Sequence, residues 1–343
     1  MGKSRVIVVD DSAFMRKLIS DMISSDEKFE IVAKLRNGKE LLEKIDNLKP
    51  DIVTLDLEMP VLDGLSTLKE LKRLKKRFPV IMLSSLTGEG SRQTIECLEQ
   101  GAVDFIEKPS GSISLDIKKI EDTLLNKMHA ILDEPGTRKT KRIVAGNKRV
   151  MRPNFGVEAI LVGASTGGPK ALQKVLTKLD GDIGVPVLVV QHMPKGFTKA
   201  FAERLDNICK LKVVEAEEGM NIVRNTIYIA PGGFHMTIGE NKRIKLDQDP
   251  TIWGVRPAVD KLFKSAVKVY GGKLISVILT GMGRDGANGT EDVKDSGGIT
   301  ISQSESTCII YGMPKAAYET GKVDMVLPLE EIGGKITSLA KGR

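Results

Sequence analysis

Three residues in the second half of the chain could together carry out acyl transfer. Ser165 follows the apolar run 159–164, His192 follows the run 187–191, and Asp285 comes shortly after a third run. If these runs are parallel strands, all three side chains emerge at one edge of one sheet, where open α/β sheets build their sites. Serine, histidine and aspartate are also the three groups that an acyl-transfer site needs. We therefore predict a hydrolase.

Ser165 lies in a glycine-rich turn, residues 163–168, that fits the G-x-S-x-G pattern between a strand and a helix. Small residues let the backbone turn sharply and leave the hydroxyl exposed at the start of the helix. The same turn also fits a phosphate-binding loop, and the turn alone does not decide between the two. It is not a Walker A loop, because Lys170 does not directly follow the second glycine.

His192 lies 27 residues after Ser165, a span that fits a strand end, a helix and the next strand. The imidazole is the expected base for the serine proton, because it is largely neutral at pH 7. Of the other two histidines, His235 also follows a predicted strand and is the reserve base. His129 lies in a predicted helix, where we expect a surface role.

Asp285 is the expected hydrogen-bond acceptor for the far nitrogen of His192, which would fix the histidine tautomer. The alternative is a turn aspartate, since Gly-Arg-Asp-Gly is good turn chemistry. Asp260 competes for the same role and ranks second, because it lies near a predicted helix start. The backbone N–H groups of Met282 and Thr166 are candidate oxyanion donors.

The first half places five polar residues at the ends of predicted strands: Asp10, Asp11, Asp56, Ser84 and Lys108. Three carboxylates at one edge repel each other unless a cation lies between them, and hard oxygen ligands suit Mg²⁺. A lysine and a hydroxyl facing that cation would cradle a phosphoryl group. Asp56 is the expected acceptor, because carboxylates form acyl phosphates. Helix caps or solvated loop charges would explain single acids but not all five positions.

The apolar pattern predicts the elements that position these residues. In the first half, amphipathic segments separate five predicted strands: 6–9, 31–34, 52–55, 80–83 and 103–106. In the second half, seven strands are predicted: 159–162, 185–190, 212–214, 227–230, 274–279, 298–301 and 325–327. Alternation of strands and helices predicts parallel α/β sheets covered on both faces. The order Ser, His, Asp differs from that of α/β-hydrolases, so we expect a Rossmann-like doubly wound, mostly parallel second domain.

The net charge of +7 belongs to one segment. Residues 138–152 carry seven Lys or Arg and no acid, so the rest of the chain sums to about zero. We expect a solvated linker, with an acidic partner or membrane surface as the alternative. Nucleic acid is not expected, because aromatic content is only 4% and no binding module is recognisable. The predicted boundaries are a first domain at 1–134, a basic linker at 135–153 and a catalytic domain at 154–343.

Composition also bears on location. No apolar stretch approaches the roughly 18 residues needed to span a bilayer, and the N-terminus leads into a strand instead of a signal sequence. Cys97, Cys209 and Cys308 are far apart, which favours reduced thiols over a disulfide framework or zinc site. We expect a cytoplasmic protein.

The first half resembles the receiver domain of two-component response regulators over about residues 4–133. The resemblance is carried by the Asp-Asp pair, Asp56 within residues 55–60, Gly64, Ser84 and Lys108-Pro109. It implies a flavodoxin-like (βα)5 fold and Mg²⁺-dependent phosphorylation of Asp56 by a histidine kinase.

The receiver resemblance also implies a role for each residue of the pocket. The implied metal ligands are Asp10, Asp11, Asp56 and the backbone carbonyl of Glu58. Lys108 would pair with the phosphoryl group. Ser84 and Phe105 match the hydroxyl and aromatic switch positions.

The whole chain resembles the chemotaxis protein-glutamate methylesterase family, CheB. Besides the receiver, six ordered motifs carry the resemblance: 163–168, 191–194, 230–233, 256–257, 281–286 and 311–314. It implies cofactor-free hydrolysis of glutamate γ-methyl esters on chemoreceptors, with release of methanol, and phosphorylation by the kinase CheA. Some relatives also deamidate receptor glutamines. The resemblance also implies that the protein associates with membranes only through the receptors. Trp253 and the basic segment are left unexplained.

Three other functions fit parts of the sequence. A receptor glutaminase would use the same three residues, and a catalytically silent binding module would use the glycine-rich turn as an anion site. A DNA-binding regulator would need a compact helical output domain, which the strand-rich second half argues against. For the esterase, we expect the unphosphorylated receiver to cover the site and phosphorylation of Asp56 to loosen that contact by drawing in Ser84 and Phe105.

Overall fold

A computed structural model describes most of the chain as two compact units. The described residues are 2–85, 88–108, 114–133 and 156–342. The units divide after Pro135, and each is treated by itself below. The expected linker, 135–153, and Pro109 of the receiver motif lie outside the described residues.

The first unit contains a five-stranded sheet in which all neighbouring strands are parallel. Its strands are β1 (Ser4–Val9), β2 (Phe29–Leu35), β3 (Ile52–Asp56), β4 (Val80–Ser84) and β5 (Asp104–Glu107). The spatial order is β2-β1-β3-β4-β5. This is the flavodoxin-like order, so the fold predicted for the first half is confirmed.

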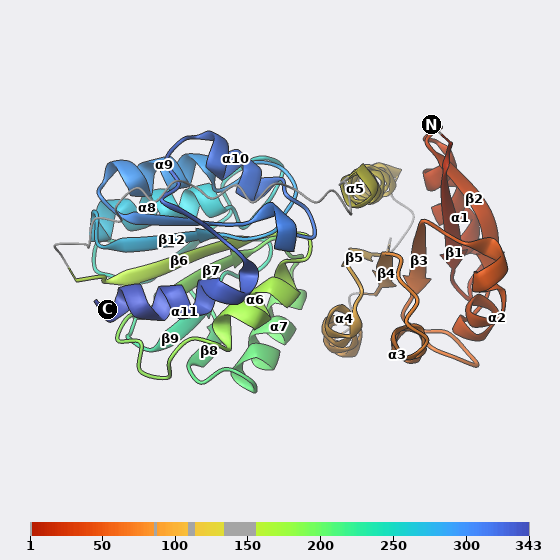
Figure 1. The fold of residues 1–343 in the computed structure, drawn as a ribbon, viewed down its shortest axis with the longest axis horizontal. Coiled ribbons are helices and arrows are strands. Elements are labelled where there is room, and N and C mark those ends of the chain that lie inside the picture. The colour runs from red at the N-terminus through yellow and green to blue at the C-terminus, as the bar shows by residue number, and fades with distance from the viewer. Residues whose placement is uncertain (1, 86–87, 109–113, 134–155, 343) are drawn as a thin grey trace. The chain divides into compact units, whose positions relative to one another are not determined.

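Five helices cover the two faces of this sheet: α1 (Ala13–Ser24), α2 (Gly38–Leu48), α3 (Gly64–Arg73), α4 (Gly88–Gln100) and α5 (Ser114–Asp133). Helices α1 and α5 lie on one face, and α2, α3 and α4 lie on the other (Figure 1). Ser12, Asn37 and Asp63 cap α1, α2 and α3, each accepting a backbone hydrogen bond. The caps fix where each helix leaves the carboxyl end of a strand.

The second unit contains a seven-stranded parallel sheet. Its strands are β6 (Ala159–Ala164), β7 (Val187–Gln191), β8 (Lys212–Glu215), β9 (Thr226–Ile229), β12 (Leu274–Ile278), β13 (Ile299–Gln303) and β14 (Met325–Leu327). The order is β14-β13-β12-β6-β7-β9-β8. After β6 the chain adds β7, β8 and β9 on one side of that strand, and it then adds β12, β13 and β14 on the other side. The junction of β6 and β12 is therefore the topological switch point, where ligands bind in such sheets.

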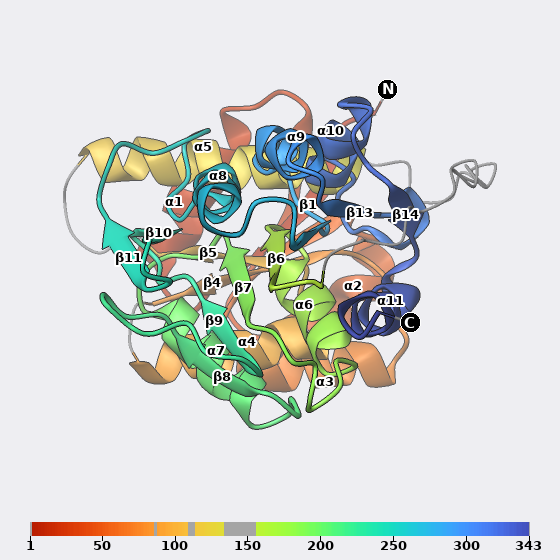
Figure 2. The same cartoon turned by 90° about the vertical axis from the view of Figure 1, so that its left-hand side faces the viewer.

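Helices cover both faces of this sheet too, which confirms the doubly wound fold. On one face lie α6 (Gly168–Leu176), α7 (Phe197–Asp206) and α11 (Leu329–Ala340). On the other lie α8 (Val259–Tyr270), α9 (Ala287–Asp295) and α10 (Met313–Glu319) (Figures 1 and 2). A 3-10 turn, Glu305–Thr307, follows β13. Strands buried on both faces need apolar side chains throughout, which explains the nearly continuous apolar runs in the sequence.

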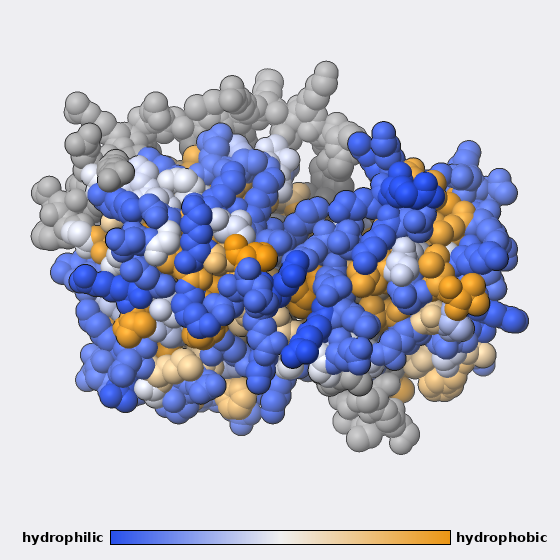
Figure 3. Space-filling model, turned by 90° about the horizontal axis from the view of Figure 1, so that it is seen from below, coloured by the Kyte–Doolittle hydropathy of each residue, from blue (hydrophilic) through white to orange (hydrophobic). Residues whose placement is uncertain are grey.

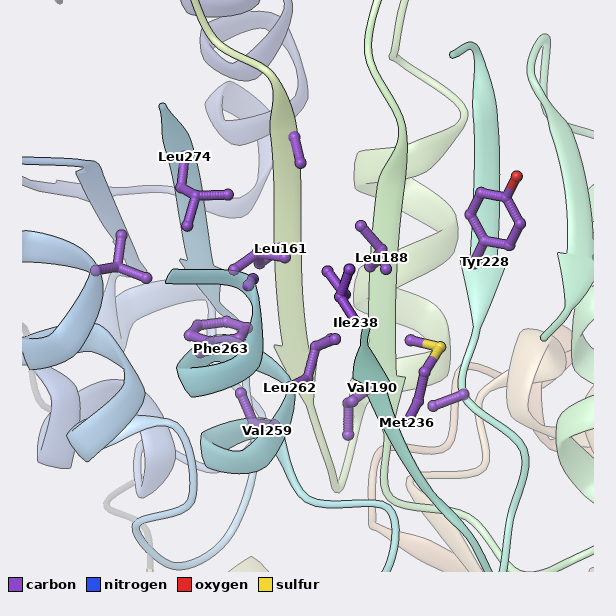
Figure 4. Close-up of a cluster of buried hydrophobic side chains, with 14 of the residues drawn as sticks. Leu161, Leu188, Val190, Tyr228, Met236, Ile238, Val259, Leu262, Phe263 and Leu274 are labelled. Atoms are coloured by element: carbon purple, nitrogen blue, oxygen red, sulfur yellow. The ribbon is translucent and has the colours of Figure 1, made fainter. Parts of the chain in front are cut away.

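An antiparallel hairpin outside the main sheet was not predicted. It consists of β10 (His235–Ile238) and β11 (Ile244–Asp247), strands of four residues each. Figure 4 shows Met236 of this hairpin beside Val190 of β7, and Phe263 of α8 near Leu161 of β6. The hairpin thus completes the cover of one sheet face. Both strands mix polar with apolar residues, so they lack the apolar runs by which the other strands were identified from the sequence.

The surface has no large apolar area on the face drawn in Figure 3, where hydrophobic residues form small patches between hydrophilic ones. Among the described residues, no helix has the length and hydropathy that crossing a membrane requires. The three cysteines are free thiols.

The core of the second unit gives the first testable prediction. Phe263 is fully buried, and the backbone of Gly289 approaches it so closely that a Cβ there would lie 2.6 Å from the Phe263 Cβ. We expect Phe263→Ala to lower the free energy of unfolding by about 3–5 kcal/mol, and the half-exposed control Val223→Ala by under about 0.5 kcal/mol. Trp253 is the only tryptophan, so its fluorescence during denaturation reports on this unit. Equal losses for the two variants would contradict this packing.

Candidate active site and phosphoacceptor pocket

Ser165 and His192 directly follow paired residues of neighbouring strands. Ala164 at the end of β6 lies opposite Gln191 at the end of β7. The His192 N–H donates to the Ala164 carbonyl at 3.1 Å, and the Ser165 N–H donates to the carbonyl of Thr280 at 3.0 Å. The two side chains therefore leave the sheet side by side, at its carboxyl edge and next to the switch point.

The glycine-rich turn after β6 is tight. Its N-cap residue, Gly167, has φ +74°, a left-handed conformation that favours glycine, and the Gly168 N–H donates to the Ser165 carbonyl at 2.7 Å. Gly281 lies against the serine, since a Cβ there would come within 2.7 Å of the Ser165 Cβ. Ser165 is thus half-buried at the start of α6.

His192 and Asp285 form a buried pair. Nε2 of His192 lies 2.8 Å from Oδ2 of Asp285, and the two side chains are 9% and 2% exposed. Asp285 also accepts the backbone N–H groups of Val259 at 2.6 Å and Asp260 at 2.9 Å. These belong to the first turn of α8, whose positive end stabilises a carboxylate.

This pairing assigns the two imidazole nitrogens. An ionised carboxylate only accepts hydrogen bonds, so Nε2 of His192 carries the proton in the neutral ring. Nδ1 is left as the acceptor. No hydrogen bond joins Ser165 to His192 among the described residues, and catalytic hydrogen bonds often tighten only when substrate binds.

Asp260 forms no hydrogen bond with His192 in the described structure. Its Oδ1 accepts the N–H groups of Gly286 at 2.9 Å and Gly289 at 2.8 Å, at the start of α9. Its Oδ2 accepts the indole N–H of Trp253 at 2.9 Å. Burial raises the pKa of Asp260, and the charge of Asp285 adds to that rise. Of the two acids, Asp285 is the one hydrogen-bonded to His192 in the described structure, and its catalytic role remains a prediction.

The other two histidines have structural partners. His235 begins β10 and is fully buried, its Nδ1 accepting the Ala258 N–H at 3.2 Å and its Nε2 lying 3.1 Å from the carbonyl of Pro250. With both nitrogens engaged, and its pKa lowered by burial, His235 is a neutral structural residue. His129 pairs with Asp26 at 2.6 Å.

The expected oxyanion donors lie on the two loops that meet at Ser165. The Met282 N–H finds no acceptor within the described parts of the chain, as a donor reserved for substrate requires. The carbonyl of the preceding Gly281 accepts the N–H groups of Gly312 at 3.1 Å and Met313 at 2.8 Å, which holds this loop in place. Thr166 is buried beside the serine. The oxyanion role of both residues remains a prediction.

Two supporting residues were missed by the sequence analysis. The buried amide of Gln191 donates to the carbonyls of Ser165 at 3.0 Å and His192 at 3.1 Å, and so ties the two loops together. The Thr280 hydroxyl lies 3.0 Å from the carbonyl of Thr166 and accepts the Ile310 N–H at 3.0 Å. Polar residues at the ends of otherwise apolar strands were the available signal.

In the first unit, Lys108 joins two buried acids. Its Nζ lies 2.9 Å from Oδ2 of Asp10 and 2.7 Å from Oδ1 of Asp56, and both carboxylates are almost fully buried. Burial raises the pKa of Asp56 to about 6, although the pairing with Lys108 opposes that rise. Burial alone would lower the pKa of Lys108, but its two carboxylate partners outweigh burial and raise it.

These acids suit a hard cation. Carboxylate oxygens of Asp10, Asp11 and Asp56 lie within 4.8 Å of one another. In the described structure, the buried Oδ2 of Asp56 has no hydrogen-bond partner, so an oxygen ligand is available. Three carboxylates with one exposed member fit Mg²⁺, which keeps several of its waters. The Glu58 carbonyl, two residues after Asp56, remains a predicted ligand.

The predicted switch residues lie near this pocket. Ser84 is buried at the end of β4; its Oγ accepts the Thr94 hydroxyl at 2.6 Å, and its carbonyl accepts the Lys108 N–H at 2.8 Å. Phe105 on β5 is buried, with Nζ of Lys127 5.6 Å from its ring centre. Their part in switching remains a prediction.

Fold and sites together define a class, an α/β hydrolase joined to a receiver. The family model described as CheB methylesterase matches residues 160–336, and the model for the response regulator receiver domain matches residues 6–118. The chain belongs to the CheB methylesterase family.

Individual relatives match over nearly the whole chain. A Clostridium acetobutylicum protein named protein-glutamate methylesterase/protein-glutamine glutaminase is 49% identical, over 100% of this chain and 99% of its own. A Syntrophomonas wolfei protein of the same designation is 44% identical, over 99% and 100%. The crystal structure of the Thermotoga maritima CheB methylesterase catalytic domain is 42% identical with a TM-score of 0.52, and covers 54% of this chain and all of that one.

The raised pKa of Asp56 predicts that its charge destabilises the first unit at neutral pH. A folded pKa of about 6, above the ordinary 3.8, means that the contribution of Asp56 to stability is most favourable below about pH 4 and is lost as the pH rises through 6. Without divalent cation, we expect Asp56→Asn to raise the free energy of unfolding by about 1–3 kcal/mol at neutral pH and much less at about pH 4.

Amide hydrogen exchange separates the two units and measures this gain. Asp46→Asn is the control, since its carboxylate is 76% exposed on the same unit and should change stability little at either pH. A gain from Asp56→Asn that does not depend on pH would contradict the role of charge burial.

Proposed function

We propose that this chain hydrolyses γ-methyl esters of glutamate residues in chemoreceptors, using Ser165, His192 and Asp285, under the control of phosphorylation at Asp56. The observation that supports this most is the placement of all three residues after the carboxyl ends of the neighbouring strands β6, β7 and β12, with the His192–Asp285 bond at 2.8 Å. The names of the relatives supply the substrate, the methyl ester of a protein glutamate.

In the proposed mechanism, Ser165 Oγ attacks the ester carbonyl carbon while Nδ1 of His192 takes the hydroxyl proton. The oxyanion is held by the N–H groups of Met282 and Thr166. When the C–O bond breaks, His192 gives the proton to the leaving methoxide, and methanol departs. Water then attacks the acyl-serine with His192 again as base, which frees the glutamate carboxylate and restores Ser165. Asp285 stabilises the imidazolium in both steps.

The same residues suit deamidation of glutamine. A primary amide gives the same acyl-serine, with ammonia in place of methanol as the leaving group. The relatives carry both activities in their names, so both products should be measured. All groups that the hydrolysis uses come from the protein, and no cofactor takes part in this proposal.

Asp56 is the proposed phosphoryl acceptor, and a histidine kinase such as CheA the proposed donor. Asp10, Asp11, Asp56 and the Glu58 carbonyl would hold Mg²⁺, which neutralises charge on the phosphoryl group when bound. Lys108, now paired with Asp56, would move to a phosphoryl oxygen. Ser84 and Phe105 would move toward the phosphorylated Asp56, and their movement would change the surface of the unit. We place this activity in the cytoplasm, where the kinase and the receptor helices lie.

The direct test is release of methanol from methylated receptor membranes, with and without a small phosphodonor and Mg²⁺. We expect the donor to raise the rate in the wild type and in the exposed-site control Asp46→Ala. It should not do so in Asp56→Ala. Ser165→Ala should lose at least about a thousandfold in turnover, as removal of a catalytic serine generally does.

Three outcomes would contradict the proposal. Normal methanol release by Ser165→Ala would exclude this serine as nucleophile. Release of ammonia alone by folded, phosphorylated protein would leave a glutaminase, and release of neither product would favour a binding module.

A further inference from the structure

We propose that Arg284 and Trp253 form a recognition rim at the active site, which binds an acidic side chain close to the esterified glutamate of the substrate. The inference rests on the proposed function and adds a feature of its substrate, a carboxylate on the same polypeptide as the ester.

Arg284 lies in a loop that contacts the catalytic residues at both of its ends. At one end, Gly281 lies against Ser165, where a Cβ would come within 2.7 Å of the serine Cβ. At the other end, Asp285 binds His192. Arg284 is exposed between these fixed points, beside the partly exposed Met282. Arg284 is therefore an exposed residue next to the histidine partner, on the loop that borders the site.

The guanidinium of Arg284 forms no ion pair with a carboxylate in the described part of the chain. Its guanidinium carbon lies 4.8 Å from the centre of the Trp253 ring. Stacking on an indole covers one face of a guanidinium and holds its plane, while the N–H groups at the edge stay available. A guanidinium held in this way is suited to binding a carboxylate with two parallel hydrogen bonds.

Trp253 is itself fixed to the catalytic framework. Its indole N–H donates to Oδ2 of Asp260 at 2.9 Å, and Oδ1 of the same carboxylate holds the first turn of α9. Since α9 begins directly after Asp285, one network positions the histidine partner and the ring on which Arg284 lies.

The backbone conformation at Trp253 is unfavourable for a bulky residue, which indicates that this side chain has a role besides folding. Ile252 and Val255 exchange two backbone hydrogen bonds at 3.2 and 3.0 Å, and the two residues between them, Trp253 and Gly254, have φ +53° and +78°. Positive φ at both positions defines a type I′ turn, in which asparagine-glycine is favoured and a bulky residue is strained. Yet the Trp253 side chain is half exposed, so core packing does not explain it.

Two receptor fragments test the rim. Each carries a single glutamyl methyl ester, and they differ only in that the acidic residues within two helical turns of the ester are kept or replaced by alanine. Glutamine is avoided because it is a candidate substrate. We expect phosphorylated wild type to favour the acidic fragment by about fivefold in kcat/KM, the size of one exposed ion pair. The preference should lie in KM and should fall as salt is added.

Arg284→Gln should reduce this preference to about one. Arg224→Gln is the matched control: this exposed arginine precedes β9, at the opposite edge of the sheet from the site, and its replacement should leave the preference intact. Arg284→Lys should restore only part of the preference, because an ammonium lacks the planar fork.

Trp253→Asn separates recognition from folding. It supplies the favoured asparagine-glycine turn, which offsets the loss of the indole bond to Asp260, so we expect the thermal midpoint to stay close to that of the wild type while the preference for acid falls. A lower midpoint with the preference retained would make Trp253 structural and overturn its part in the proposal.

The outcomes also separate this inference from the proposed function. Wild type that hydrolyses both fragments equally would overturn the rim and leave the esterase standing. An acid preference that Arg284→Gln retains would overturn the rim as well. Hydrolysis of neither fragment would overturn the proposed function, and the rim with it.

Discussion

The carboxylate of Asp285 holds together the parts on which the second unit's site depends. It binds Nε2 of His192 and two N–H groups at the start of α8, a helix whose N-cap residue, Ala258, has no capping side chain. In return, Asp260 on α8 binds two N–H groups at the start of α9, whose N-cap is Gly286. The helices on either side of the switch point thus cap each other. The negative charge of Asp285, which orients His192, is stabilised by the positive N-terminal end of a helix. No cationic side chain is needed there, and none in the described part of the chain competes with the imidazole for the carboxylate.

The first unit uses buried charge in the opposite way. There, Asp10 and Asp56 share Lys108 as their charged partner, and the pKa of Asp56 is raised to about 6 because burial outweighs that pairing. The surroundings of Asp285 donate hydrogen bonds to its carboxylate, whereas the surroundings of Asp56 disfavour its ionised form. A buried carboxylate whose ionised form is disfavoured is suited to bind a cation and to accept a phosphoryl group. A carboxylate that accepts three hydrogen bonds is suited to keep its position during turnover.

Much of this was predictable, because parallel sheets bring strand ends to one edge. All twelve strands predicted from apolar runs are present, and the residues that follow them (Ser165, His192, Asp56 and Lys108) lie where that rule places them. The hairpin of β10 and β11 was not predicted, because its two short strands mix polar with apolar residues and lack the apolar runs by which the others were identified. Nor could spacing reveal the bonds of Gln191, the mutual capping by Asp260 and Asp285, or the Trp253 turn. These depend on loops whose paths are set by tertiary contacts.

The central claim is that Asp285 fixes His192 with its proton on Nε2 and its base at Nδ1. Nitrogen-15 NMR of the imidazoles measures this directly, and a His192→Gln spectrum assigns the signal among the three histidines. At neutral pH we expect His192 to be in the Nε2-protonated tautomer, and Asp285→Asn to remove that preference. A neutral His192 protonated on Nδ1, or one whose tautomer does not respond to Asp285→Asn, would contradict the account.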